Sequence, residues 1–335
     1  MNARQAATTI CMLVCAGICP AAAAGPLRTI HLDDDLFSGM SSDADYTGGG
    51  AIALTNEISD DASPGMLDWL SRMDRMTGVQ ASRYRYELEL GAAAFTPADI
   101  ARKEAILSDR PYAGLVYLSG ALVQEQGALS SAVTTLTLGY LGGDFVPRAQ
   151  RRVHRTMRSI QPEGWHHQIS DGGEATARVM HERQWAGATM NFAGARLQWL
   201  YRAGAGIGFL TDVNAGVAAR WGRFTDPRWS IHSSPTGLSD RAMFSHADHR
   251  DRFIYGSVSA KVPFYNALLQ GQFRDSDVTI PSDARRHFVP EVALGLVIGL
   301  SRGRDLHYFI RAQLSDMRLP ERSDTTVYGG VSLSW

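Results

Sequence analysis

The chain has 335 residues, of which 44% are hydrophobic and 20% are charged, and its formal net charge is −1. This composition argues against a disordered protein, and the near-neutral charge argues against a polyanion such as nucleic acid as the partner. The length suits one large domain or two of ordinary size.

The first 24 residues have the features of a secretory signal peptide. Arg4 supplies a positive charge, residues 6–19 are apolar, and four consecutive alanines then precede the expected cleavage site. The apolar run is too short to anchor the chain across a bilayer. All three cysteines lie in this segment, so the exported chain would have no disulfide. We expect residues 1–24 to be removed and residues 25–335 to form a single domain.

Segments that alternate between apolar and polar residues follow one another along the rest of the chain. The clearest is Arg83 to Leu90, RYRYELEL. Such alternation places one face of a strand in an apolar medium and the other in a polar one. About twelve candidate strands can be counted, at roughly 28–35, 47–59, 81–95, 111–126, 129–142, 173–187, 193–209, 211–222, 252–262, 286–301, 304–316 and 325–335.

Three features favour a membrane barrel over a soluble β-sandwich, which would show the same alternation. Many segments reach the roughly 9–11 residues that a tilted strand needs to cross a bilayer. The exported chain has no cysteine framework, and its last residues, 329–335, resemble the closing strand of bacterial outer-membrane barrels. No apolar run of about 18 residues remains for a membrane-spanning helix. We therefore expect an all-β fold, a transmembrane antiparallel β-barrel of about twelve strands.

An even number of strands leaves both termini in the periplasm and the loops after odd-numbered strands outside. These external loops are expected at about 36–46, 96–110, 143–172, 263–285 and 317–324. The stretch 223–251 is long for a periplasmic turn, and nothing in its residues accounts for that length.

Two segments near the outer end of the first hairpin could carry chemistry. Asp33, Asp34 and Asp35 are adjacent carboxylates, which suit a hydrated rim or the oxygen shell of a hard cation. A solvated loop start is the simpler interpretation. Thr47 precedes three glycines, which let a ligand or another chain segment approach closely but are also common at strand ends.

A short basic helix is predicted in the third external loop. Asp144 could cap it, and Pro147 suits its first turn. One face would carry an apolar stripe of Val146, Val153, Met157 and Ile160. The other face carries five arginines and His154. Arginines on the outer surface suit the phosphates of lipopolysaccharide, and on this basis alone His154 is either an ordinary surface group or part of a site.

Other external residues allow simpler interpretations. Arg102 and Lys103 belong to a cationic loop. His166 and His167 are adjacent and would point to different faces of a strand, so we expect hydration rather than a shared metal ion. Trp165 is expected to pack at the interface.

In chain order, several segments resemble the outer-membrane lipid A 3′-O-deacylases, the LpxR family. DDDLF is similar to the family's Asn-Asp pattern, and DADYTGGG is similar to its Tyr-Thr-x-Gly element. SDRPYAGLVYL is a close match to its Asp-Arg-Pro-Tyr-Ala-Gly block. RRVHR followed by EGWHHQI keeps the family's histidine and tryptophan, and YNALLQGQFRDSDVTI resembles a late segment. The resemblance covers about residues 30–280.

The resemblance implies a twelve-stranded barrel whose active site lies between the outer barrel wall and an external helix. It implies calcium-dependent hydrolysis of an ester-linked acyloxyacyl chain on lipid A. By position, His154 would be the general base, Thr47 the active-site hydroxyl residue, and Asp34 and Asp35 the pair near Ca²⁺. Asp35 would also be a catalytic residue. The family's basic loop residue has no single counterpart, and Lys103 and Arg102 are both candidates.

Two departures from the family pattern stand out. The family has Asn where this chain has Asp34, and the register against Asp33 is ambiguous by one. The family's acidic residue six positions after the histidine is Ile160 here, and Glu163 is a candidate substitute.

The predicted function is therefore a lipid A 3′-O-deacylase of the bacterial outer membrane, with its active site on the external side. Histidine can take a proton from water near neutral pH, and Ca²⁺ can stabilise an oxyanion. Arg151 and Arg155 would bind the substrate. The expected partners are lipopolysaccharide and the surrounding bilayer, and the expected state is a monomer. Two alternatives remain: a non-enzymatic barrel that is porin-like or binds lipopolysaccharide, and an outer-membrane phospholipase.

Overall fold

The computed structural model describes residues 26–39, 45–57, 83–127, 129–226, 230–234, 240–243, 250–301, 303–318 and 325–335. The predicted signal peptide, residues 1–24, lies outside these residues.

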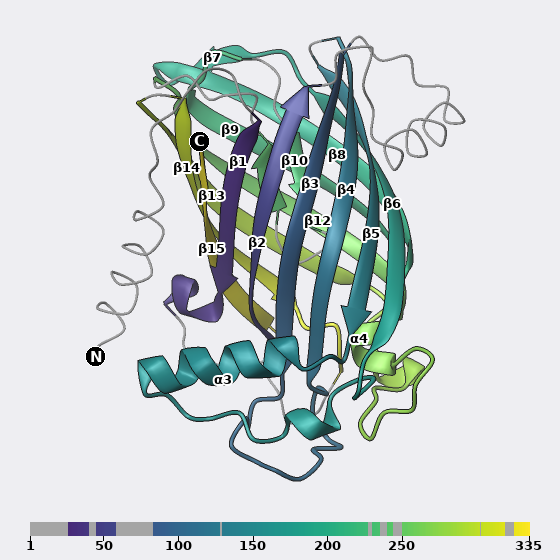
Figure 1. Cartoon of the computed structure of the whole chain (residues 1–335). Coiled ribbons are helices and arrows are strands. Elements are labelled where there is room, and N and C mark those ends of the chain that lie inside the picture. Colours follow the sequence, from purple (N-terminus) through teal and green to yellow (C-terminus); the bar gives the residue numbers. More distant parts are fainter. Residues whose placement is uncertain are drawn as a thin grey trace.

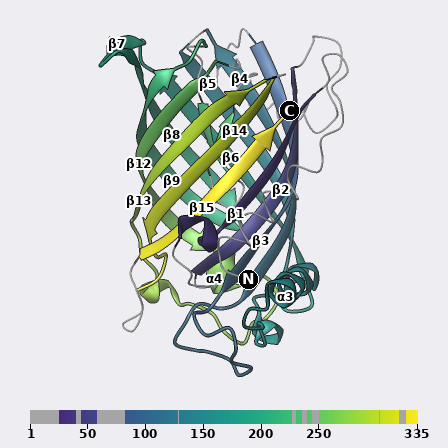
Figure 2. The same cartoon turned by 90° about the vertical axis from the view of Figure 1, so that its left-hand side faces the viewer.

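Twelve long strands form a closed antiparallel barrel, which confirms the predicted fold class (Figures 1 and 2). The barrel closes where β1 pairs with β15 and where β6 pairs with β8. Each predicted strand overlaps an observed one. They are β1 (Leu27–Asp34), β2 (Asp45–Glu57), β3 (Arg83–Thr96), β4 (Ala113–Gln126), β5 (Ser130–Leu141), β6 (Glu174–Ala186), β8 (Ala195–Gly208), β9 (Leu210–Arg223), β12 (Arg252–Asn266), β13 (Val289–Leu300), β14 (Arg304–Leu314) and β15 (Thr325–Ser334).

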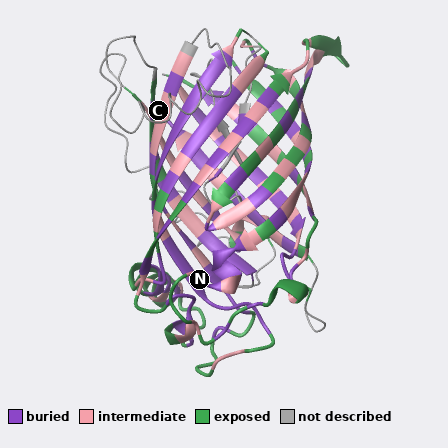
Figure 3. Ribbon diagram, turned by 90° about the vertical axis from the view of Figure 1, so that its right-hand side faces the viewer, coloured by how far each residue is buried: buried purple, intermediate pink, exposed green. Residues whose placement is uncertain are grey.

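Alternate side chains along the strands are exposed and buried, which gives the wall the chequered pattern of Figure 3. In β3, Leu90 is 58% exposed on the outer face, whereas Arg85 and Glu89 are buried. Arg85 forms an ion pair of 2.7 Å with Glu125 on the next strand. The two faces of RYRYELEL therefore meet lipid and barrel interior, as its alternation predicted.

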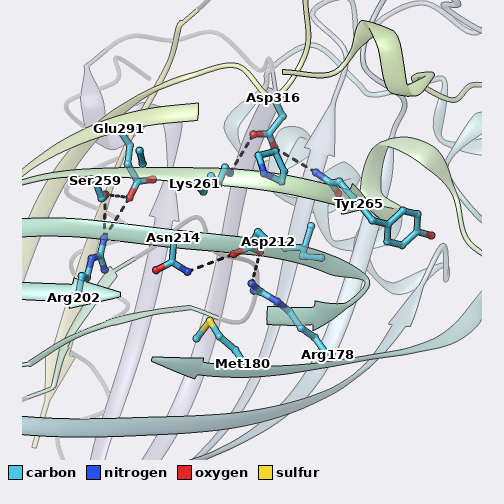
Figure 4. Close-up of a pocket in the computed structure, with 14 residues that line it drawn as sticks. Arg178, Met180, Arg202, Asp212, Asn214, Ser259, Lys261, Tyr265, Glu291 and Asp316 are labelled. Carbon is cyan, nitrogen blue, oxygen red and sulfur yellow. Dashed lines mark hydrogen bonds and ion pairs between the residues drawn. The ribbon is translucent and has the colours of Figure 1, made fainter. Parts of the chain in front are cut away.

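Ion pairs in the barrel interior link strands that are separated by one intervening strand (Figure 4). Arg178 of β6 meets Asp212 of β9 at 2.6 Å. Lys261 of β12 meets Asp316, which follows β14, at 3.1 Å. The cavity between these pairs measures only about 40 Å³. Buried charges are costly unless they are paired, so this part of the interior is a packed network of charges.

The two ends of the barrel differ. One carries α3 (Phe145–Met157), α4 (Ala267–Gln270) and three single-turn helices at Asp35–Ser38, Trp165–His167 and Ser282–Ala284. The C-terminal end of β15 lies at the opposite end (Figure 1). None of the described helices has the length and hydrophobicity of one that crosses a membrane.

The stretch 223–251, which the sequence left without explanation, contains a hairpin of β10 (Ser230–Ser233) and β11 (Asp240–Met243). Ile231 is buried in a cluster with Leu200 and Phe253. Its backbone N–H and carbonyl both bond to the side chain of Gln184, at 3.1 and 2.5 Å. The described part of this stretch therefore packs against residues of the barrel strands. The remaining strand, β7 (Met190–Phe192), pairs with the start of β8.

Candidate functional site

At the end of β1, the carboxylates of two neighbouring residues point in different directions. Asp33 faces the interior, where Tyr46 donates a hydrogen bond of 2.5 Å to its Oδ1 and His31 Nε2 lies 3.0 Å from its Oδ2. Asp34 accepts a hydrogen bond of 2.9 Å from Leu36 N and so caps the following turn. Because successive residues of a strand point to opposite faces, Asp33 and Asp34 cannot act at the same site.

The glycine run of β2 makes room for these two carboxylates. A Cβ on Gly48 would lie 2.9 Å from Asp34 Oδ2, and a Cβ on Gly49 would lie 2.5 Å from the Tyr46 hydroxyl. The β2–β3 register shifts between Tyr46 and Gly48, at Thr47. The hydroxyl of Thr47 is buried and shares a hydrogen bond of 2.6 Å with Thr96. Glycine is required here by close approach rather than by an unusual backbone angle.

Helix α3 packs against the outer face of the barrel wall, over β3 and β4 (Figure 1). A Cβ on Gly114 of β4 would lie 2.9 Å from Val146 Cβ, so the helix rests directly on the strand. Trp165 packs 4.8 Å from the ring of Tyr112, whose hydroxyl donates to Ile100 O. Trp165 is buried inside the protein, in a cluster with Ile100, Tyr112 and Val146.

The DRPYAG block builds the loop on which α3 rests. The Asp109 carboxylate accepts hydrogen bonds from the backbone N–H groups of Ala98 and Arg110, at 2.8 and 2.6 Å. The guanidinium of Arg110 stacks over the ring of Phe95 at 4.4 Å. Tyr112 and Gly114 complete the support for the helix. The motif thus shapes the site, although none of its residues lines the cavity described below.

The buried face of α3 differs from the predicted apolar stripe. Val146, Gln150 and His154 are buried at helical spacing, whereas Val153 is 50% exposed and Ile160, beyond the helix, is 65% exposed. An apolar stripe marks the buried face of a helix whose other face meets water. Beside a barrel the exposed surface of a helix can meet lipid, and the surface facing the wall can hold polar groups.

A cavity of about 240 Å³ lies between α3 and the outer face of the wall. Its wall side includes residues 47–50 and 92–94, and its helix side includes Val153 and Met157. Three of the predicted site residues line it: Asp34, Thr47 and His154. Asp34 and Thr47 come from the consecutive strands β1 and β2, whereas His154 comes from α3, much later in the chain.

The other predicted site residues do not line this cavity. Asp35 is buried in the turn after β1. Arg102, Lys103, Arg155 and Glu163 are exposed, and Arg151 is half-buried on α3. Of the adjacent histidines, His166 is exposed, and His167 Nδ1 lies 2.5 Å from Asp277 Oδ2.

The ring of His154 is held by the backbone. Its Nδ1 lies 2.6 Å from the carbonyl oxygen of Ile160, and the side chain is only 6% exposed. Sequence reasoning sought a side-chain acid six positions after the histidine and did not consider the peptide group at that position. No pattern of side chains marks such an acceptor, because every residue carries a carbonyl.

No group of three or more His, Cys, Asp or Glu side chains among the described residues is arranged to hold a metal ion. Four residues that line the cavity have side-chain oxygens, which are the ligands that calcium prefers: Asp34, Thr47, Gln150 and Ser159. These donors fit the chemistry of Ca²⁺ but fall short of its usual six to eight oxygens. A bound ion would need oxygens from water and substrate as well.

The matches to known proteins extend over nearly the whole chain. A family model described as "Outer membrane protein LpxR" matches residues 8–335. LpxR from Salmonella typhimurium superposes with a TM-score of 0.72 at 14% sequence identity, covering 92% of this chain and 99% of that one. The β-domain of the Bordetella autotransporter BrkA gives a TM-score of 0.43 at 10% identity, covering 93% of this chain and 98% of that one. No curated protein sequence matches the chain.

Proposed function

The chain belongs to the LpxR family of outer-membrane β-barrel proteins, and from this we propose that it removes the 3′-linked acyloxyacyl chain of lipid A. Membership of the family implies lipid A deacylation, the hydrolysis of a carboxylic ester. The residues and steps below are our proposal for this chain.

One observation carries the proposal: Asp34, Thr47 and His154 line a single cavity on the outer face of the wall. A cavity in that position is reached from the side of the barrel, where lipid lies, and not through the lumen. Its surface is largely apolar, with alanines, glycines, Val153 and Met157. Such a lining suits the start of an acyl chain.

In the proposed reaction, His154 acts as general base through Nε2. It takes one proton from a water molecule whose oxygen attacks the ester carbonyl carbon. The tetrahedral intermediate then collapses, the bond from that carbon to the sugar oxygen breaks, and the protonated imidazole returns the proton to the leaving oxygen. The products are a free acyloxyacyl acid and a lipid A with a free hydroxyl at the 3′ position. Thr47 would orient the water or the ester carbonyl.

Calcium is part of the proposal as the ion that Asp34 would hold, with Thr47 as a second oxygen donor. When bound, Ca²⁺ would supply positive charge to stabilise the oxyanion of the ester carbonyl. Asp35 and Glu163 have no part in this proposal, because neither lines the cavity.

The arginines of α3 are proposed to bind the phosphates of lipid A. Arg151 and Arg155 lie one turn apart on the helix that carries His154, and arginine binds phosphate through two parallel hydrogen bonds. Lys103 and Arg102, in the neighbouring loop, are further candidates for this contact. A monomer is sufficient for the mechanism, since all the proposed residues belong to one chain.

The direct test uses purified, refolded protein with lipid A, in calcium or in chelator, and mass spectrometry of the products. Loss of the 3′ acyloxyacyl group only with calcium is the expected result. His154→Ala should lower the rate by about a hundredfold to ten-thousandfold, the usual contribution of general base catalysis. His166→Ala is the matched control, because His166 is exposed outside the cavity. Unchanged lipid A under every condition would refute the proposal that the chain is a lipid A deacylase. Release of fatty acid from glycerophospholipid instead would indicate a phospholipase.

A further inference from the structure

The imidazole of His154 has one engaged and one available ring nitrogen. Its Nδ1 lies 2.6 Å from the carbonyl oxygen of Ile160. A carbonyl can only accept, so Nδ1 must carry the hydrogen. In the neutral ring the lone pair is then on Nε2. Within the described residues, no hydrogen bond to Nε2 is found.

The acceptor is brought back to the histidine by the way α3 ends. Arg158 has a left-handed backbone, with φ 57° and ψ 36°, and its N–H donates to Arg155 O and His154 O. Ser159 N donates to His154 O at 2.9 Å. This turn reverses the chain after the last helical residue, so that the Ile160 carbonyl faces the ring of His154. The side chain of Ile160 takes no part, since it is 65% exposed.

We propose that the main-chain carbonyl of Ile160 is the positioning group of this site, and that the left-handed turn at Arg158 holds it in place. The carbonyl fixes the tautomer in which Nδ1 carries the hydrogen and Nε2 can accept a proton. The second nitrogen of a working histidine commonly donates to a carboxylate or a carbonyl for this purpose. Here a neutral peptide group orients the ring without placing a negative charge beside it.

This proposal rests on the proposed function for one point only, the reaction that His154 catalyses. The tautomer of His154 can be observed without any substrate. The protein is labelled with ¹⁵N-histidine, refolded in micelles, and examined by NMR at a pH where the ring is neutral. The signal that disappears in His154→Ala is that of His154. Nitrogen shifts that show the hydrogen on Nδ1 support the proposal, and shifts that show it on Nε2 overturn it.

Two substitutions at Arg158 test the turn. Arg158→Gly and Arg158→Val remove the same exposed charge, but glycine accepts the left-handed conformation and a β-branched residue does not. We expect Arg158→Gly to keep the Nδ1–H tautomer. Arg158→Val should mix the tautomers and lower kcat by about tenfold to a hundredfold, the scale expected for a misplaced base, with KM changed less than twofold. Equal kcat values in the two variants would overturn the role of the turn.

A third variant separates the carbonyl from the side chain. Ile160→Ala keeps the peptide group and removes an exposed side chain, so the tautomer should be unchanged. A tautomer shift in Ile160→Ala would overturn the assignment to the carbonyl. Failure of the proposed function is recognised separately: the Nδ1–H tautomer would be present in folded wild-type protein that leaves lipid A intact.

Discussion

The indole N–H of Trp165 donates a hydrogen bond of 2.7 Å to the side-chain carbonyl of Gln150, and both side chains are buried. Gln150 lies in the middle of α3, and Trp165 lies in the loop that returns from it. The same indole packs against Tyr112 beside the wall. The bond therefore ties the helix that carries His154 to the loop and barrel beneath it.

Trp165→Phe keeps an aromatic ring but removes the donor, which leaves the buried oxygen of Gln150 without this partner. The cost of an unsatisfied buried group is about 1–3 kcal/mol, and it should weaken the docking of α3 rather than the barrel. We expect lower deacylation and faster proteolysis of the α3 loop, with an unchanged heat-modifiable shift on gels. The control is Trp199→Phe, because Trp199 lies exposed on the outer face of β8. Wild-type activity and protease resistance in Trp165→Phe would contradict the prediction.

Gly48→Ala should disturb the site through Asp34. The added methyl would lie 2.9 Å from both Asp34 Oδ2 and Asp33 O, and the second of these is backbone that cannot easily move. We expect at least a tenfold loss of activity, the scale expected when a catalytic group is displaced by about an ångström. Gly256→Ala is the matched control, because its methyl would meet only ordinary contacts, the nearest at 3.4 Å. If both variants deacylate lipid A at the same rate, Gly48 has no such role.

Substitution of Asp34 should change the need for calcium in two different ways. Asp34→Asn keeps an oxygen ligand but loses its charge, so activity should return at higher calcium concentrations. Asp34→Ala removes the ligand and should be inactive at all concentrations. Calcium titration of the deacylation rate measures both effects, with exposed Asp283 as the control in Asp283→Asn. A calcium requirement of Asp34→Asn equal to that of the wild type would exclude Asp34 as a ligand.

The double variant Arg151→Ala and Arg155→Ala should bind phosphorylated lipid A less well. Solvent-exposed ion pairs contribute about 0.2–1 kcal/mol each, so KM should rise a few-fold while kcat stays close to that of the wild type. The effect should shrink in high salt, which screens exposed charges, and should vanish with dephosphorylated lipid A. Arg148→Ala is the control, since Arg148 already pairs with Asp144 at 2.6 Å. A KM increase that persists without phosphates would point to another cause.

The strands were predictable because lipid and barrel interior impose opposite demands on alternate residues, as Leu90 and Glu89 illustrate. The placement of Asp34, Thr47 and His154 at one end also followed from strand order. The burial of His154 and Gln150 did not, because it depends on whether the helix faces water, lipid or the wall. The contact between the Ile160 carbonyl and His154 could not be predicted for a different reason. Every residue has a backbone carbonyl, so the order of side chains does not show which carbonyl will accept a hydrogen bond.

The cavity under α3 lies on the outer face of the barrel wall and not in its lumen. If the proposed function is correct, the enzyme meets its substrate by diffusion within one plane. The relevant concentration is then the number of substrate molecules per unit of membrane area, or the mole fraction in a micelle. Added inert detergent should slow the reaction, whereas dilution of the whole suspension with buffer should not. Rates expressed per litre would therefore differ between preparations of the same protein.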